Sequence, residues 1–271
     1  MPSTYAHYRM GCDVIKRLSP RLKRIIIPNR RFFDIGLHGP DILFYYYPVL
    51  PNHVNLRGYS MHRSDPARFF SEAADIIRSE HQVSARGRMT AYIMGFICHY
   101  ILDKNCHGLI YHLQHKEGIA HSRTESAFER KLLVKDGYDP LKKTVTGHIV
   151  PSSAVCRIIA RFFKGISASQ IKRSLKNQVF YCNTLVTGSY IKRFLLKTLF
   201  LFTGCYGFFR YLLISRHTDK TADKYCGELM RLYNRSTDEA VYALGLYYDH
   251  LYGKRPVKRI KGFKRDFRGR K

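Results

Sequence analysis

The sequence predicts an all-α protein, a multi-helix bundle with a metal cluster between its helices. Apolar residues recur at spacings of three and four along most of the 271-residue chain, and few stretches alternate apolar and polar residues as strands do. Histidines and carboxylates also occur four residues apart, a spacing that places them on one face of a helix. Hydrophobic residues make up 45% of the chain, which is enough to bury a core and excludes a disordered protein.

The helices follow from start and stop signals along the chain. Ser19 and Pro20 end a first helix over residues 4–18, and residues 28–63 are expected to be irregular because Gly, Pro and Asn are frequent there. Asp65 has the pattern of an N-cap, and Pro66 that of a first helical residue. The remaining helices are predicted over residues 65–81, 87–104, 120–136, 152–164, 167–182, 189–216, 220–234 and 237–252.

One stretch within these helices, residues 194–214, is strongly apolar but contains Lys197 and Arg210. Its charge-free part is too short to span a bilayer of ~30 Å. A buried helix and a helix lying in the membrane interface are therefore the two main interpretations, and a membrane-spanning helix is the third.

Charge narrows the choice of partners. The chain has 47 Lys+Arg and 20 Asp+Glu, a net charge of +27, which favours anionic lipid, nucleic acid or a phosphate-bearing substrate. Residues 254–271 contain ten basic residues and one acid, and are expected to form a disordered basic tail. Seven cysteines without a regular framework indicate free thiols. With no visible signal peptide, we expect a cytoplasmic protein that can bind peripherally at the inner face of the membrane.

The most informative motif is His99-x-x-x-Asp103, followed by His107 and then by His121-x-x-x-Glu125. Each histidine–carboxylate pair lies one helical turn apart, so two such helices packed face to face would bring imidazoles and carboxylates together. These donors suit zinc, and adjacent zinc ions lower the pKa of a bridging water and stabilise phosphoryl charge. The alternative is two amphipathic helices whose polar residues face solvent.

This pattern resembles the zinc-dependent phospholipase C family, which includes a phospholipase D catalytic domain and is structurally akin to the S1/P1 nucleases. The resemblance covers residues 1–150 and implies an all-α fold with two or three zinc ions between helices. Residues 151–253 would continue the same domain. The resemblance further implies that His7, Asp41 and His62 are ligands upstream of the motif.

By this resemblance the ligands fall into three groups. Asp41, His62, His99 and Asp103 would bind one zinc, with Asp41 also a candidate general base. A second zinc would be bound by His107, His121 and Glu125. His7 would bind a third, which Asp103 bridges to the first.

The chain departs from the family pattern in two ways. Secreted members use an N-terminal tryptophan as a metal ligand, and this chain has no tryptophan, although loss of Met1 would expose the Pro2 amine. The spacing from Asp103 to His107 is shorter than in those enzymes, which leaves His112 and His115 as alternatives to His107. His38 and His53 are alternatives to Asp41 or His62.

Three functions fit these observations. The first is a zinc-dependent hydrolase that attacks the phosphorus of a phospholipid at an anionic membrane surface. The second is a nuclease like the S1/P1 enzymes, with nucleic acid as its partner. The third is a non-catalytic basic helical protein associated with membrane or RNA, whose metals are structural. The sequence indicates no protein partner.

Overall fold

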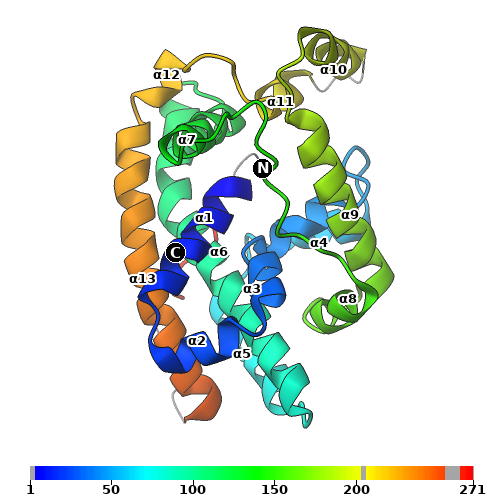
Figure 1. Cartoon of the computed structure of the whole chain (residues 1–271), viewed down its shortest axis with the longest axis vertical. Coiled ribbons are helices and arrows are strands. Elements are labelled where there is room, and N and C mark those ends of the chain that lie inside the picture. The colour runs from blue at the N-terminus through cyan, green and yellow to red at the C-terminus, as the bar shows by residue number, and fades with distance from the viewer. Residues whose placement is uncertain (1–3, 203–205, 254–262, 271) are drawn as a thin grey trace. The chain divides into compact units, whose positions relative to one another are not determined.

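The computed structural model describes residues 4–202, 206–253 and 263–270, and the all-α prediction is confirmed: this part of the chain forms helices and no strands. The α-helices are α1 (Thr4–Arg17), α2 (Pro20–Ile26), α3 (Arg30–Gly36), α4 (His53–Met61), α5 (Pro66–Arg78), α6 (Val83–Lys116), α7 (His121–Lys135), α8 (Ser153–Ala160), α9 (Ala168–Leu185), α10 (Tyr190–Phe202), α11 (Tyr206–Phe209), α12 (Lys220–Asp223) and α13 (Cys226–Tyr252), and the 3-10 helices are η1 (Gly39–Tyr45) and η2 (Arg210–Leu212) (Figure 1).

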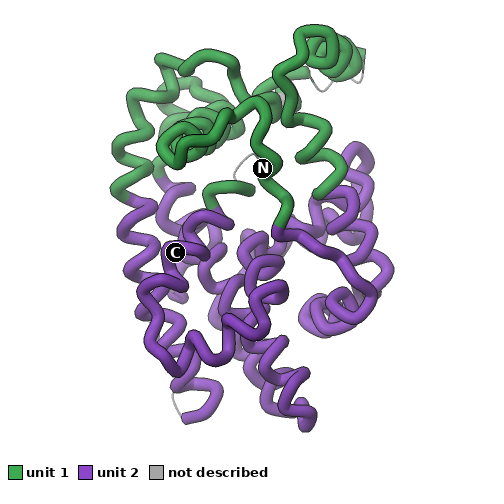
Figure 2. The backbone as a smooth tube through the Cα atoms, in the orientation of Figure 1, with its two compact units in different colours: residues 1–6, 109–147, 179–231 green, residues 7–108, 148–178, 232–271 purple. Residues whose placement is uncertain are grey.

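The chain divides into two compact units (Figure 2). Unit 1 comprises residues 1–6, 109–147 and 179–231, and unit 2 comprises residues 7–108, 148–178 and 232–271. Most boundaries between the two units fall within a helix. The helices divided in this way are α1, α6, α9 and α13. Each unit therefore combines segments from both sides of residue 150, and the division of the sequence at that residue stays a prediction.

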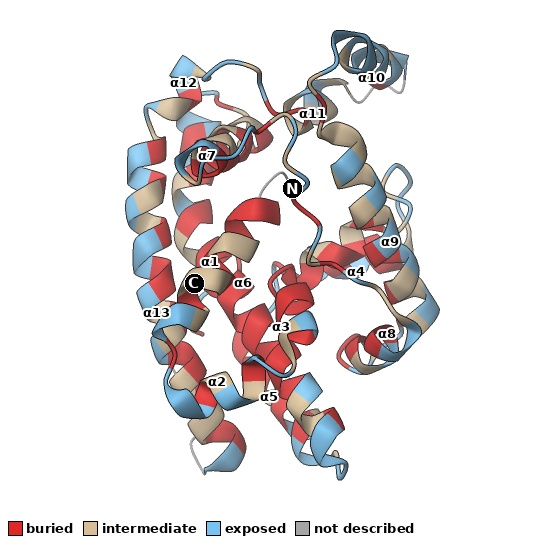
Figure 3. Cartoon of the chain, in the orientation of Figure 1, coloured by how far each residue is buried: buried red, intermediate tan, exposed pale blue. Residues whose placement is uncertain are grey.

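Helix α6 is the central element of unit 2. Every residue from Thr90 to Leu102 is buried, because apolar side chains occupy all sides of the helix and not a single stripe (Figure 3). The helix is also longer than the predicted 87–104, and it continues without a break past His107. Asp103 and His107 therefore lie on the same helix as His99, one turn apart from each other in succession.

Two glycines let α3 approach α6 closely. A Cβ on Gly36 would collide with the carbonyl oxygen of Tyr92, and one on Gly95 would collide with that of Phe33. Backbones can come this near only where both side chains are hydrogen atoms. The close crossing brings the chain that follows α3, with Asp41 in η1, over the part of α6 that contains His99.

The expectation that residues 28–63 are irregular is wrong, because α3, η1 and α4 form there. These helices have seven to nine residues, too few for apolar periodicity to be visible in the sequence. Helix α4 begins with a capping box, in which the Asn52 side chain accepts from the Asn55 N–H and the Asn55 side chain accepts from the Asn52 N–H. The next predicted cap is confirmed: Asp65 accepts a hydrogen bond of 2.9 Å from the Ala67 N–H, ahead of α5.

The chain over residues 189–216 forms α10, α11 and η2, not one helix, and residues 203–205 lie outside the described part. Helix α10 is mostly exposed, and Phe200 is its one buried residue, so the interpretation of a buried helix is wrong. No helix in the described ranges is both long and apolar enough to cross a membrane. Downstream, the boundary predicted near residue 235 is also absent, since α13 is continuous from Cys226 to Tyr252.

The basic tail predicted over residues 254–271 differs from the structure in one part. Residues 254–262 and 271 lie outside the described residues, but residues 263–270 pack onto unit 2. Phe263 and Phe267 are 2% and 1% exposed. These two phenylalanines were overlooked in the sequence because the segment is so basic. Their burial stabilises a folded segment by removing aromatic surface from water.

Candidate metal centre

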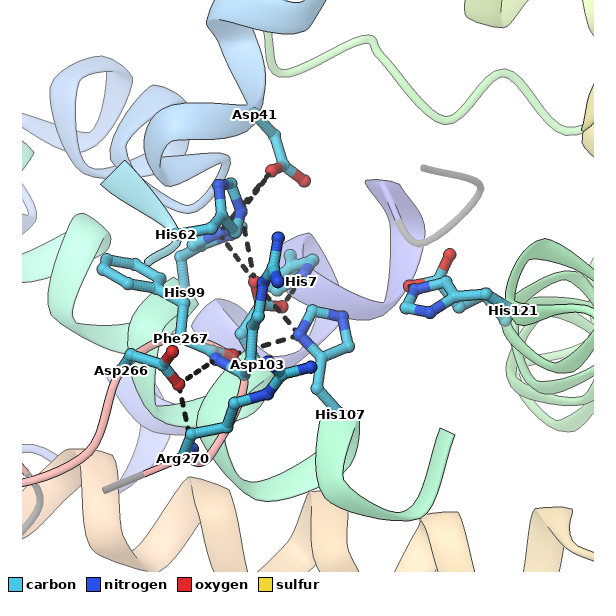
Figure 4. A network of polar contacts seen from close by, with 12 residues as sticks. His7, Asp41, His62, His99, Asp103, His107, His121, Asp266, Phe267 and Arg270 are labelled. Carbon is cyan, nitrogen blue, oxygen red and sulfur yellow. Dashed lines mark hydrogen bonds and ion pairs between the residues drawn. The ribbon is translucent and has the colours of Figure 1, made fainter. Parts of the chain in front are cut away.

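Asp103 on α6 is a buried carboxylate surrounded by imidazoles (Figure 4). Its Oδ1 lies 3.3 Å from Nε2 of His7 on α1, and its Oδ2 lies 3.2 Å from Nε2 of His99 one turn earlier on the same helix. Oδ2 is also 3.7 Å from His62 Nε2 and 3.8 Å from His107 Nδ1. One carboxylate thus faces four histidines from three helical segments of unit 2.

A second carboxylate, Asp41 in η1, meets two of the same histidines. Its Oδ1 lies 3.0 Å from Nε2 of His62, the residue that follows α4, and 4.0 Å from Nε2 of His99. Helix α4 packs directly against η1, which brings His62 over Asp41. Two sets of ligand atoms result, Asp41–His62–His99 and His7–His99–Asp103, and within each set all atoms lie within 4.8 Å of one another.

Backbone carbonyls fix the tautomers of three histidines. Nδ1 of His62 donates to the Gly58 carbonyl (2.8 Å), Nδ1 of His99 to the Leu37 carbonyl (3.2 Å), and Nδ1 of His107 to the Phe267 carbonyl (3.1 Å). A carbonyl can only accept, so the proton of each neutral imidazole is on Nδ1. Nε2 is then the atom left to bind a metal, the arrangement in which outer partners orient ligand histidines.

These tautomers make a cation necessary. With its proton on Nδ1, His99 directs an Nε2 lone pair toward the Asp103 carboxylate, and His62 does the same toward Asp41. Two acceptors at such distances repel each other unless a proton or a metal ion lies between them. Within the described part of the chain, His99 Nε2 and His7 Nδ1 are buried atoms without a hydrogen-bond partner. The residues present therefore fit a metal that binds nitrogen and oxygen ligands, such as zinc.

In the absence of metal, protons take this role. Burial lowers the pKa of His99, but the charges of Asp103 and Asp41 outweigh it and raise the pKa above its usual value. Burial likewise raises the pKa of Asp103, yet His99 and His107 hold it well below its usual range. For Asp41 the hydrogen bond with His62 and the charge of His99 overcome burial and lower the pKa. Both carboxylates are thus ionised at neutral pH, as metal ligands must be.

His7 differs from His99, because burial and the neighbouring charge of His99 lower the pKa of His7. Its ring stacks on that of His99 with the centroids 4.3 Å apart. A neutral imidazole is the form that coordinates metal.

In unit 1, the predicted pair on α7 is formed as expected. His121 Nε2 lies 3.2 Å from Glu125 Oε1, and Glu125 is buried. One turn further on, Glu129 accepts a hydrogen bond from the Tyr5 N–H, and burial raises the pKa of this carboxyl to about 8. His107, the remaining predicted ligand, belongs to unit 2. Sequence analysis missed Glu129, although its spacing of four from Glu125 continues the line of His121 and Glu125.

The alternative histidines do not join these groups. His112 and His115 are exposed, whereas His107 is buried. His38 Nε2 lies 2.7 Å from His148 Nε2, and His53 Nε2 lies 2.9 Å from the Gln170 side-chain amide. The structure brings Asp41 and His62 close to His99, and their role as metal ligands stays a prediction. The glycine before Pro40 has a role that the sequence did not indicate: Gly39 has a φ of +48°, and a Cβ there would collide with the His99 ring.

Comparison with known proteins identifies a family. The family described as zinc dependent phospholipase C matches residues 6–199 of the chain. No curated protein and no solved structure matches it. The matched range includes every predicted ligand, and residues 263–270 lie beyond it.

Proposed function

The chain belongs to the zinc-dependent phospholipase C family of hydrolases, and from this premise we propose that it hydrolyses a phosphodiester bond of a phospholipid, with zinc bound at the cluster around Asp103. The observation that carries the proposal is the pairing of buried lone pairs with carboxylates, His99 with Asp103 and His62 with Asp41. The cluster needs a cation, and the chain belongs to a family of zinc hydrolases, so zinc is the cation that explains the cluster best.

We assign the ligands in three groups. Asp41, His62, His99 and Asp103 would hold one zinc, and His7 together with Asp103 would hold another. The 4.8 Å limit within the sets Asp41–His62–His99 and His7–His99–Asp103 supports these two assignments. His107, His121 and Glu125 bind a further zinc by the family resemblance, supported by the burial of His107 and by the His121–Glu125 pair. The chain would then hold two or three ions.

Zinc, when bound, lowers the pKa of water and stabilises charge on a phosphoryl group. The residues of the chain divide the remaining work. Asp103, whose side chain is 7% exposed, holds the histidines together from within the cluster. Asp41, at 17% exposed, is the more accessible carboxylate and stays ionised, so it is the group that accepts a proton from attacking water. His62, whose Nε2 lies 3.0 Å from Asp41 Oδ1, would hold zinc beside that carboxylate.

The substrate surface is proposed to be an anionic membrane. From Pro140 to Thr218 the sequence contains no Asp or Glu, and α10 lies within this stretch. Ile191, Phe194 and Phe202, which the helical repeat places on one side of α10, are 74%, 68% and 86% exposed. Leu195 and Leu201 extend this apolar face, whose borders carry basic residues. Such a helix suits the interface between acyl chains and anionic headgroups.

The cysteines support a proposal for the compartment. Cys12, Cys98, Cys156 and Cys226 are free thiols in the part of the chain that the structure describes. Free thiols fit a reducing compartment, so we propose that the protein acts from the cytoplasmic side, at the inner face of the membrane.

The test of the activity is hydrolysis of phosphatidylcholine and phosphatidylglycerol vesicles by the zinc-loaded protein, beside single-stranded DNA and RNA of equal phosphate content. The Asp41→Asn variant serves as the catalytic control. Release of a phosphorylated headgroup by the wild type and not by the variant supports the proposal. Cleavage of nucleic acid alone would indicate a nuclease, and zinc binding without turnover on any substrate would indicate a structural metal centre.

Membrane binding has its own test, co-sedimentation with vesicles that contain phosphatidylglycerol. Ile191→Glu places a charge on the apolar face of α10, and Val83→Glu is the matched control, since Val83 is 80% exposed on α6 in unit 2. Binding of the wild type that salt weakens, and that Ile191→Glu alone abolishes, supports α10 as the docking helix. Equal binding by all three proteins would refute it.

A further inference from the structure

Residues 263–270, which we call the C-terminal turn, form a compact structure outside the range that matches the family. The Asp266 carboxylate accepts from the backbone N–H groups of Arg268 and Arg270, both at 2.9 Å, and the Asp266 N–H donates to the Arg270 carbonyl at 2.9 Å. Gly269 has a φ of +75°, which a side chain would strain. The turn is therefore determined by its own sequence.

The C-terminal turn is docked on helix α6. The Tyr100 hydroxyl donates a 2.6 Å hydrogen bond to the Arg265 carbonyl, and the Phe263 ring stacks on Phe70 with the centroids 4.7 Å apart. At Gly269 a Cβ would come within 2.7 Å of the Lys104 carbonyl oxygen, so the turn also touches α6 one turn beyond Tyr100. These contacts cover the segment of α6 that contains Asp103.

Phe267 connects this turn with the cluster (Figure 4). Its ring is buried, and the ring centroid lies 5.3 Å from that of His62 and 6.1 Å from that of His99. Its carbonyl oxygen accepts the Nδ1–H of His107 at 3.1 Å. The ring thus packs against two histidines of the cluster, and the carbonyl orients a third.

His107 differs from His62 and His99 in the part of the sequence that supplies its carbonyl acceptor. His62 and His99 are oriented by the carbonyls of Gly58 and Leu37, both within the range that matches the family. His107 is oriented by a residue 160 positions later in the sequence. Asp103 Oδ2 lies 3.8 Å from the same Nδ1, beyond hydrogen-bond distance, so loss of the Phe267 acceptor weakens the preference of the proton for Nδ1 over Nε2.

We propose that the C-terminal turn is part of the metal centre, in which Phe267 is a positioning residue that keeps Nε2 of His107 available to zinc and closes the cluster beside His62 and His99. The inference rests on the proposed assignment of His107 as a zinc ligand. It adds that the matched region 6–199 needs this distant segment to hold its metals at full affinity. Partners that orient metal ligands typically contribute 10–100-fold to metal affinity.

The first test compares two substitutions within the turn. Phe267→Ala removes the ring beside His62 and His99, and Phe263→Ala removes a ring of equal size, also buried, that stacks on Phe70. Zinc affinity is measured by competition with a chromophoric chelator, and thermal unfolding of the metal-free proteins is measured alongside. We expect both variants to lose stability, and Phe267→Ala alone to bind zinc at least about 10-fold more weakly. Equal affinities in the two variants would overturn the proposal.

The second test does not depend on zinc or on hydrolysis. Imidazole ¹⁵N chemical shifts of the metal-free full chain report the tautomer of His107, with its signal assigned by comparison with His107→Gln. The wild type is expected to carry the proton on Nδ1, and a chain ending at residue 262 to show a mixture of tautomers. An unchanged Nδ1 tautomer in the shortened chain would refute the role of Phe267 even if the protein is an active hydrolase. If the shortened chain does not fold, the same spectrum of Asp266→Ala decides, because this variant loses the two hydrogen bonds that the carboxylate accepts within the turn.

Discussion

The substitution Gly39→Ala tests how the fold positions His99. Gly39 has a φ of +48°, and the added Cβ would collide with Cδ2 and Cγ of the His99 ring. The left-handed conformation costs a residue with a side chain about 1–2 kcal/mol. The collision also displaces the His99 ring. This ring is buried and hydrogen-bonded through Nδ1 to the Leu37 carbonyl, and it must move away from Asp103.

Gly118→Ala is the matched control for Gly39→Ala. Gly118 has a φ of +67° with no atom within 4 Å of an added Cβ, so it carries the conformational cost alone. We expect Gly118→Ala to lose about 1–2 kcal/mol in denaturant unfolding of the metal-free protein, and Gly39→Ala to lose more than Gly118→Ala. In zinc competition only Gly39→Ala should weaken binding, by about 10-fold or more. Equal losses of stability and unchanged zinc affinity in both variants would show that the His99 position is not set by Gly39.

Two further predictions concern buried carboxylates. Asp103→Asn removes the charge that raises the pKa of His99, so the His99 pKa should fall in an NMR titration of the metal-free variant. Zinc affinity should drop at least about 100-fold. An unchanged pKa of His99 would contradict the geometry of the cluster. Glu129 has its pKa raised to about 8 by burial, from 4.5, so the folded metal-free protein binds the extra proton between these pH values and becomes less stable as pH rises through them. Glu129→Gln should remove this loss, on the order of 4 kcal/mol at pH 8, in urea unfolding at pH 5 and pH 8; an unchanged pH dependence would mean that Glu129 is not the titrating group.

The parts of the site that sequence predicts well are local. His99 and Asp103 are one turn apart on a helix, so their meeting follows from helical geometry alone. His121 and Glu125 form their pair for the same reason. His7, Asp41 and His62 came from the family resemblance, since their approach to α6 depends on tertiary packing that spacing does not encode.

What the sequence did not predict depends on contacts between distant segments. The close crossing of α3 and α6 requires Gly36 and Gly95 together, and neither glycine alone indicates it. Phe267 lies in a segment whose basic charge predicts a solvated tail, yet its burial beside His62 depends on residues some 200 positions earlier. The exposure of α10 was equally hidden, because an apolar stretch is usually buried.

The most direct test of the central claim is the zinc content of the purified full chain, measured by mass spectrometry after purification without chelators. The wild type is compared with a variant that carries His99→Ala and Asp103→Asn, with circular dichroism as the check that both proteins are folded. Two or three zinc ions per wild-type chain, lost in the folded variant, would establish the cluster as the metal centre. One zinc or fewer in the wild type, or the same zinc content in both proteins, would contradict it.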